Sequence, residues 1–161
     1  MKFKILFAAM ALVGIGGLLF ASSQTPPLHD EEVHPPHAAT VYLTPDCGCC
    51  AVYANYLRTK NYEVETVELT HQELTSKRES LGIPGSLTSC HTTVTNEGGY
   101  FVEGHIPFEA INQLLDEQPD VIGIGMPGMP SGSPGMPGNQ TEPFNISQVN
   151  REGEVSPYVA L

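Results

Sequence analysis

Three cysteines stand within four consecutive residues, in the run Cys47-Gly48-Cys49-Cys50. Cys47 and Cys50 have the C-x-x-C spacing of thiol redox sites, in which Cys47 would be the nucleophile and Cys50 the resolving thiol. Thiolates are also soft, anionic metal ligands. Cys49 would promote disulfide scrambling in an oxidoreductase, whereas in a metal site it supplies one more ligand. The cluster therefore predicts either thiol redox chemistry or metal binding.

Further sulfur and imidazole groups follow later in the chain. Cys90 stands directly before His91, and His105 follows Glu103-Gly104. Three methionines lie in a segment rich in glycine and proline, and their thioethers favour Cu(I) and bind Zn²⁺ poorly. The candidate metal ligands are Cys47, Cys49, Cys50, Cys90, His91 and His105, with Met126, Met129 and Met136 as weaker candidates.

Each of these residues also has an ordinary structural interpretation. The four cysteines could pair as two disulfides, although a bond between Cys49 and Cys50 would be strained. Disulfides that stabilise a fold link cysteines that are far apart in the chain. Three cysteines within four residues therefore argue against a purely structural role. His91 could be an ordinary strand histidine, and methionines usually fill gaps in a core. Four cysteines and two histidines would also suit Zn²⁺.

The apolar pattern predicts an α/β domain that must position these groups. The predicted strands are residues 40–43, 62–69 (where the alternation shifts as at a β-bulge), 90–95 and 100–102, with a turn at 96–99; the predicted helices are 51–60, 71–81 and 107–117. The order β-α-β-α-β-β-α is that of a thioredoxin-like sandwich, which keeps its active site between the first strand and the first helix. In that fold the chain before the third strand packs against the active-site cysteines, so Cys90 and His91 are expected near Cys47.

The remaining segments lack this pattern. Residues 24–39 contain four prolines, three histidines and an acidic run, and they predict a flexible lead-in. The domain is expected to span residues 40–161. Within it, residues 123–138 contain Gly-Met-Pro three times and predict a loop without regular structure. Residues 144–161 predict a C-terminal β-hairpin.

The beginning of the chain and its charge indicate where the protein works. Residues 1–23 combine two lysines, an apolar run at 5–20 and the small residues Ala21-Ser22-Ser23, which is the pattern of a secretory signal peptide. Export, most readily to a bacterial periplasm, would permit disulfides, and only an uncleaved leader would attach the protein to a membrane. The chain has 7 Lys and Arg against 18 Asp and Glu, for a formal net charge of −11. This surface argues against nucleic acid as a partner and is compatible with cations.

Four motifs in matching order resemble the CopG-type copper-resistance proteins. They are Val41-Tyr42 to Cys47-Gly48-Cys49-Cys50, Ser89-Cys90-His91-Thr92, Gly99-Tyr100 with Val102-Glu103-Gly104-His105-Ile106-Pro107, and the Gly-Met-Pro segment from Gly125 to Met136. The resemblance covers about residues 40–138. It implies a periplasmic thioredoxin-like protein that binds several copper ions through its cysteine cluster and acts in copper redox handling. The four cysteines and the two histidines match the family's positions.

Two functions of different classes follow. The first is an exported copper-binding protein for copper tolerance, in which Cys/His ligands hold several copper ions and Cu(II) reduction is coupled to thiol oxidation, as in a copper oxidoreductase; copper ions and other periplasmic copper-handling proteins would be its partners. The second is a thiol–disulfide oxidoreductase that uses Cys47 and Cys50. A passive adaptor stapled by disulfides is a third interpretation. The methionines and the family resemblance favour copper over zinc.

Overall fold

A computed structural model describes residues 36–161, which form a seven-stranded sheet with three α-helices. The predicted leader, 1–23, and residues 24–35 of the predicted lead-in lie outside the described residues. The elements are β1 (His37–Leu43), α1 (Gly48–Thr59), β2 (Tyr62–Glu68), α2 (His71–Ser80), the short 3₁₀ helix η1 (Gly85–Leu87), β3 (Thr92–Thr95), β4 (Phe101–Glu103), α3 (Phe108–Glu117), β5 (Val121–Gly125), β6 (Asn145–Asn150) and β7 (Val155–Ala160). Among residues 36–161, no helix is both long and apolar enough to cross a membrane.

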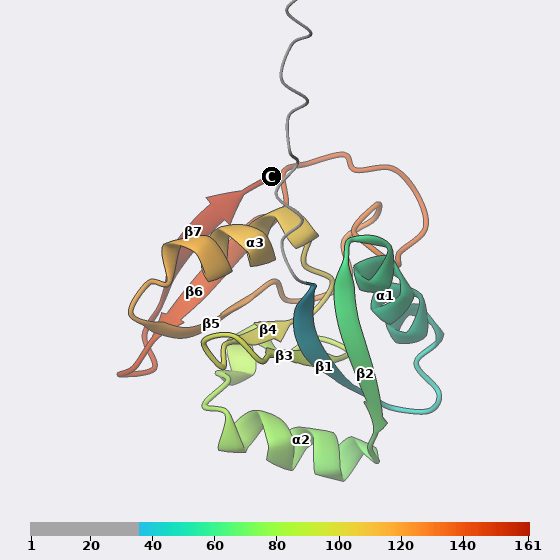
Figure 1. Cartoon of the computed structure of the whole chain (residues 1–161), viewed down its shortest axis with the longest axis horizontal. Helices are drawn as coiled ribbons and strands as arrows, with labels where there is room; N and C mark the ends of the chain where they lie inside the picture. Colours follow the sequence, from blue (N-terminus) through green and yellow to red (C-terminus); the bar gives the residue numbers. More distant parts are fainter. Residues whose placement is uncertain (1–35) are drawn as a thin grey trace, which may run out of the picture. The chain divides into compact units, whose positions relative to one another are not determined.

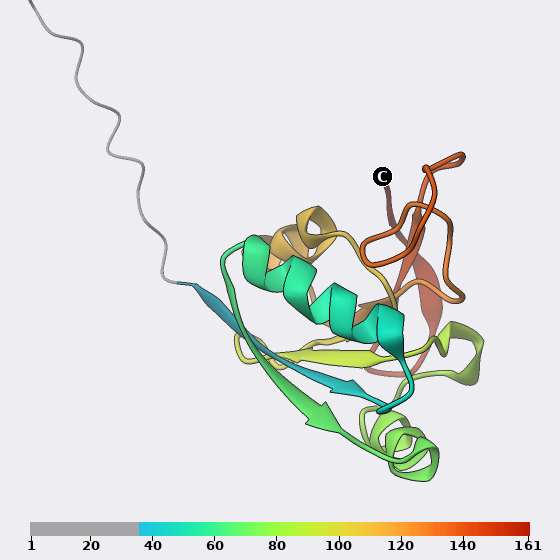
Figure 2. The same cartoon turned by 90° about the vertical axis from the view of Figure 1, so that its right-hand side faces the viewer.

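The strands lie in the order β2-β1-β3-β4-β5-β6-β7. β1 pairs in parallel with β2, and β4 with β5, whereas every other neighbouring pair is antiparallel. Helices α1 and α3 cover one face of the sheet and α2 lies on the other (Figures 1 and 2). The end of β1 lies beside the beginning of β3, because Tyr42 pairs with Thr92. Since α1 follows β1 closely in the chain, this pairing brings the segment before β3 to the cysteine cluster.

Helix α1 is held against the sheet by apolar residues at helical spacing. Cys50, Tyr53, Ala54 and Leu57 are buried, and positions i, i+3, i+4 and i+7 share one face of a helix. They pack in one core cluster with Val41 of β1 and with the buried face of α3. A smaller cluster, which includes Phe101 and Leu87, lies on the opposite face of the sheet. Because adjacent strand residues point to opposite faces, Phe101 and Val102 belong to different clusters.

The mixed α/β class, the predicted order β-α-β-α-β-β-α from β1 to α3 and the C-terminal hairpin β6–β7 are confirmed, whereas η1 and β5 were not predicted. Three local predictions were wrong. β1 begins at His37, so residues 37–39 of the predicted lead-in belong to the sheet. β2 pairs with β1 over its whole length without a register shift, so it contains no bulge. The predicted irregular segment 123–138 begins with three strand residues, because residues 123–125 pair with β4 and β6. Gly123 has no side chain, which permits its close contact with Phe101.

Candidate metal centre

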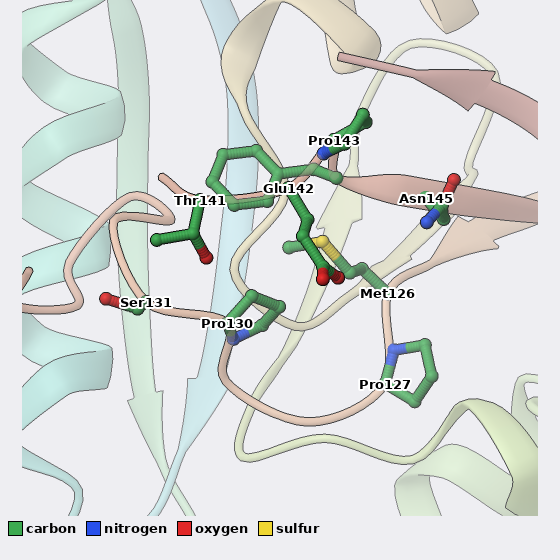
Figure 3. A pocket seen from close by; sticks show the side chains of 9 residues that line it. Met126, Pro127, Pro130, Ser131, Thr141, Glu142, Pro143 and Asn145 are labelled. Carbon is green, nitrogen blue, oxygen red and sulfur yellow. The ribbon is translucent and has the colours of Figure 1, made fainter. Parts of the chain in front are cut away.

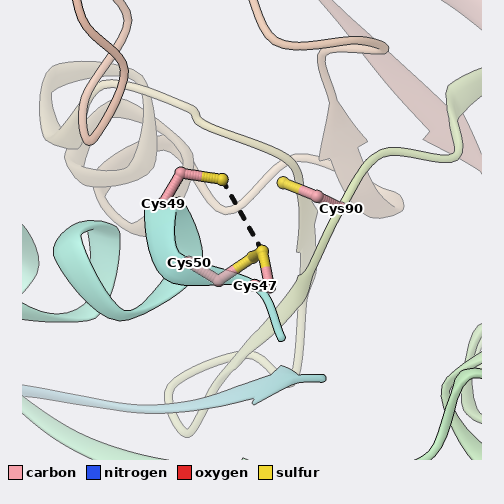
Figure 4. A group of neighbouring side chains, drawn as sticks. All are labelled: Cys47, Cys49, Cys50 and Cys90. Atoms are coloured by element: carbon pink, nitrogen blue, oxygen red, sulfur yellow. Dashed lines mark hydrogen bonds between the residues drawn. A yellow bond between two sulfur atoms is a disulfide. The ribbon is translucent and has the colours of Figure 1, made fainter. Parts of the chain in front are cut away.

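The first three cysteines occupy the start of α1, where the backbone N–H groups have no partners within the helix. Cys47 is the N-cap residue, and neither a side-chain cap nor an acidic residue occupies the first turn. Cys47 and Cys50 form a disulfide, and Cys49 is a free cysteine whose Sγ lies 3.6 Å from Cys47 Sγ (Figure 4). Cys50 is fully buried, whereas Cys47 and Cys49 are partly exposed. The positive end of the helix dipole therefore faces these sulfur atoms.

Cys90 approaches this cluster from the segment that precedes β3. It is a free cysteine, and its side chain points toward Cys49 across the start of α1 (Figure 4). All four sulfur atoms lie within 4.8 Å of one another. The expected proximity of Cys90 to Cys47 is confirmed. These cysteines can act as two redox pairs or, when reduced, as a compact set of four thiolate ligands.

His91 and His105 extend the sulfur cluster with two buried imidazoles. Cys90 Sγ lies 2.9 Å from His105 Nε2 and 3.4 Å from His91 Nδ1. His105 Nδ1 donates a hydrogen bond of 2.7 Å to the carbonyl oxygen of Pro134. Because a carbonyl only accepts, this bond places the proton of a neutral ring on Nδ1 and leaves the Nε2 lone pair facing Cys90. Within the described residues, His91 Nε2 is a buried nitrogen without a hydrogen-bond partner.

The electrostatics of this group favour neutral side chains in the absence of metal. Burial lowers the pKa of His91 well below its ordinary value, and the neighbouring His105 and Arg78 act in the same direction. Burial also lowers the pKa of His105, against the opposing effect of its bond to Pro134. Burial, followed by the charge of Cys49, raises the pKa of Cys90 to about 11. Binding of a metal ion must therefore displace a proton from Cys90, whereas the imidazoles are ready to bind.

A buried ion pair holds the segment that carries Cys90. Arg78 Nε of α2 lies 2.9 Å from Glu103 Oε1 of β4, and the Glu103 side chain is fully buried. Glu103 accepts hydrogen bonds from the Ser89 backbone N–H and the Thr92 hydroxyl, and Arg78 Nη2 donates to the Ser89 carbonyl. Burial raises the pKa of Glu103, and these hydrogen bonds and Arg78 oppose the rise. Both backbone groups of Ser89, the residue before Cys90, are thereby fixed.

Comparisons with known proteins agree with this arrangement. A family model described as "Protein of unknown function, DUF411" matches residues 87–136. Two solved structures described as forms 1 and 2 of copper resistance protein CopG are 33% and 34% identical in sequence, with TM-scores of 0.70 and 0.69. Each alignment covers 78% of this chain and 98% of the other chain. The chain belongs to the CopG family of copper-resistance proteins. A search of curated proteins found no match.

In this CopG-family chain, the three methionines of residues 123–138, the Gly/Pro/Met segment, do not share one environment. Met126 is 2% exposed and packs in the main core cluster, where it also lines a cavity of about 420 Å³ with Pro127, Pro130 and Glu142 (Figure 3). Met129 is 52% exposed, and Met136 is partly buried. The burial of Met126 agrees with the gap-filling role of core methionines. A role in copper binding stays a prediction for all three.

The Gly/Pro/Met segment reaches the Cys/His group through its backbone. The Pro134 carbonyl orients His105, and the next residue, Gly135, lies against α1 with a φ of +84°. A Cβ at this position would stand 2.9 Å from the Cys49 carbonyl oxygen and 3.0 Å from the Tyr53 backbone nitrogen. Only glycine allows this close approach without strain. The loop thus covers the histidine side of the site.

Two supporting residues were missed by the sequence reasoning. Glu103 appeared there only as part of a motif, although a carboxylate directly after the apolar run Tyr100-Phe101-Val102 was a usable signal. Tyr53 was covered only by the helix predicted over residues 51–60. Its hydroxyl donates to the Ile106 carbonyl at 2.9 Å, and its ring lies 4.4 Å from the His91 ring, centroid to centroid. No sequence pattern indicated that contact.

Proposed function

We propose that this protein is an exported copper-binding protein that serves copper tolerance and holds more than one Cu(I) ion. Copper is its cargo, and the thiolates of Cys47, Cys49, Cys50 and Cys90 would bridge the ions. The observation that carries the proposal is the gathering of four sulfur atoms within 4.8 Å of one another, with two imidazoles against Cys90. Soft thiolates favour Cu(I), and bridging lets four of them hold several ions. His91 and His105 would complete the ligand set.

The remaining features support this proposal. The strand order β2-β1-β3-β4, with α1 connecting the parallel strands β1 and β2, supports a thioredoxin-like interpretation of the chain from β1 to α3. The formal net charge of −11 favours the approach of cations. The signal-like pattern of residues 1–23 supports export to the periplasm, where other copper-handling proteins would exchange copper with this one.

A redox step is chemically available at the same site. Two Cu(II) ions would each accept one electron, and the Cys47 and Cys50 thiolates would lose these two electrons as they form their S–S bond. A disulfide between these residues, which the structure contains, would be the product of that step. When Cu(II) is added to reduced, metal-free protein, we expect one disulfide to form for every two Cu(I) produced. Cu(II) that stays unreduced while the thiols remain intact would contradict this step.

The decisive test of copper binding is an anaerobic titration of the reduced protein with Cu(I). We expect tight binding of more than one copper per chain in competition with a chelator, together with thiolate-to-copper absorbance. Cys49→Ser and Cys90→Ser should each reduce the bound copper, whereas His71→Ala, which changes an exposed histidine of α2, should not. Weak binding by the reduced protein, or full binding by both serine variants, would refute the cluster.

The second candidate function is a thiol–disulfide oxidoreductase, which the disulfide between Cys47 and Cys50 favours. A disulfide-exchange assay on Cys49→Ser separates the two candidates. An oxidoreductase would keep its exchange activity in this variant, because neither cysteine of the C-x-x-C pair is changed. A copper cluster would lose metal and little else.

A further inference from the structure

Two groups of potential metal ligands share Cys90, and only one of them depends on the Cys47–Cys50 pair. The four cysteines form the first group, and Cys90, His91 and His105 form the second, with ligand atoms again within 4.8 Å of one another. The disulfide consumes two ligands of the first group. It leaves the second group complete, because Cys90 is a free cysteine and neither imidazole takes part in the disulfide.

The second group has a different chemical preference from the first. One thiolate with two imidazoles is the ligand set of copper sites that stabilise Cu(II) as well as Cu(I), whereas a purely thiolate set favours Cu(I). In the second group, both imidazoles already direct a nitrogen atom toward Cys90. His105 presents Nε2 to Cys90 because Nδ1 is bonded to Pro134, and His91 is fully buried with Nδ1 facing the same sulfur. His91 makes no other side-chain hydrogen bond within the described residues, although a buried imidazole ordinarily needs a partner.

We propose that the disulfide form of this protein binds a single Cu(II) ion through Cys90 Sγ, His91 and His105, and that the Cys47–Cys50 disulfide switches the site between this single-ion state and the Cu(I) cluster. The inference rests on the proposed function for the cluster half of the switch. One Cu(II) ion can accept only one electron, whereas a disulfide between Cys49 and Cys90 would release two. That bond therefore forms only if a second Cu(II) ion reaches the same chain. With one Cu(II) ion held in the buried site of each chain, none is left to supply the second oxidising equivalent, and the bound ion remains Cu(II).

The test uses the purified full chain in its disulfide form, in which thiol titration should find two free thiols. One equivalent of Cu(II) is added without other ligands, and visible absorption and electron paramagnetic resonance are recorded. We expect one copper per chain, a thiolate-to-Cu(II) charge-transfer band and a Cu(II) resonance. The histidines at the beginning of the chain can also bind Cu(II), but they cannot produce a thiolate band.

Variants assign the band to its ligands. Cys90→Ser should abolish the band and His105→Gln should weaken or abolish it, whereas His71→Ala should leave it unchanged. Circular dichroism of each metal-free variant verifies the fold, and Cys90→Ser, which removes only the sulfur, decides the matter if His105→Gln fails to fold. Absence of the band in the disulfide form, or its persistence in Cys90→Ser, would overturn the proposal.

The switch is tested by adding a thiol reductant anaerobically to the loaded disulfide form. The Cu(II) resonance and the band should be lost, and the copper capacity should rise from one ion to more than one per chain. If the reduced protein binds no Cu(I) but the disulfide form still gives the band, the cluster fails and the single-ion site stands. If the cluster forms but the disulfide form gives no band, this inference fails and the proposed function stands. An unchanged band after reduction would refute the switch.

Discussion

The two sides of the candidate metal centre are built in different ways. On the thiol side, Cys47, Cys49 and Cys50 lie in one helical turn, and two of the three are partly exposed. On the imidazole side, Cys90, His91 and His105 come from two separate connections, and both histidines are fully buried. An ion pair, a backbone carbonyl and an aromatic ring hold the imidazole side in place.

Because of this difference, the thiol side can change its chemistry locally, whereas the imidazole side depends on the packing of the fold. The thiol side can open or close a disulfide within one turn of α1, because its sulfur atoms are already neighbours in sequence. The imidazole side depends on packing between α2, β4 and the Gly/Pro/Met loop, so a change there disturbs several elements at once. We therefore expect substitutions on the imidazole side to reduce stability, whereas substitutions on the thiol side should mainly alter copper and redox behaviour.

The largest effect is expected from Glu103→Ala. The substitution leaves Arg78 without its ion-pair partner, and it leaves the Ser89 N–H and the Thr92 hydroxyl without their acceptor. Removing one member of a buried ion pair costs about 3–5 kcal/mol of folding free energy. Denaturant unfolding of the metal-free protein measures the loss. The control Arg151→Ala breaks the exposed ion pair with Asp120 and should change little. Equal losses of stability in the two variants would mean that the buried ion pair does not stabilise the imidazole side, and the contrast with the thiol side would fail.

Gly135→Ala should have the next largest effect. A left-handed backbone costs an ordinary residue roughly 1–2 kcal/mol, and here the new Cβ also meets the backbone of α1. Gly128→Ala is the matched control, because Gly128 has a φ of +77° but nothing within 4 Å of its added Cβ. Unfolding free energies should differ between the variants, and only Gly135→Ala should shift the nuclear magnetic resonance signals of the His105 ring. Equal losses of unfolding free energy in the two variants would mean that the close contact between Gly135 and α1 does not matter for stability.

Tyr53→Phe is a smaller change that tests the hydrogen bond of the tyrosine whose ring lies beside His91. It removes the hydroxyl that donates to the Ile106 carbonyl but keeps the ring against His91, and a lost hydrogen bond costs about 1 kcal/mol. Thermal and denaturant unfolding report the loss. Tyr100→Phe removes a longer bond of 3.3 Å to the Pro119 carbonyl and should cost less. No measurable loss in Tyr53→Phe would show that the Tyr53 hydroxyl contributes nothing to the stability of the imidazole side.

The smallest effect on stability is expected from Cys49→Ser in the metal-free disulfide form. Cys49 is partly exposed, and substitutions away from buried contacts usually change the free energy of unfolding by less than about 0.5 kcal/mol. A calorimetric comparison with the parent protein measures this. A loss of several kcal/mol would mean that the thiol side is also a structural element, and the contrast between the two sides would fail.

Much of the fold was predictable because its signals are local. Helical spacing of apolar residues predicted α1, and the turn residues 96–99 predicted the hairpin of β3 and β4. β5 was missed because a strand that contains Gly123 and Gly125 has no favourable intrinsic propensity. Its pairing with β4 and β6 stabilises it instead, and sequence pattern does not report that pairing.

By itself, the sequence determined the identities of the chemical groups: three thiols spaced for one helical turn, a Cys-His pair, a further histidine and an acidic chain. Spacing within a helix is local, so the thiol cluster follows directly from it. The fold inferred from the sequence already placed Cys90 near Cys47. Only the tertiary structure decided that its sulfur lies within 4.8 Å of the other three, that Pro134 orients His105, and that Arg78 and Glu103 fix Ser89. These contacts join residues far apart in the chain, and their geometry depends on how the sheet and helices pack together.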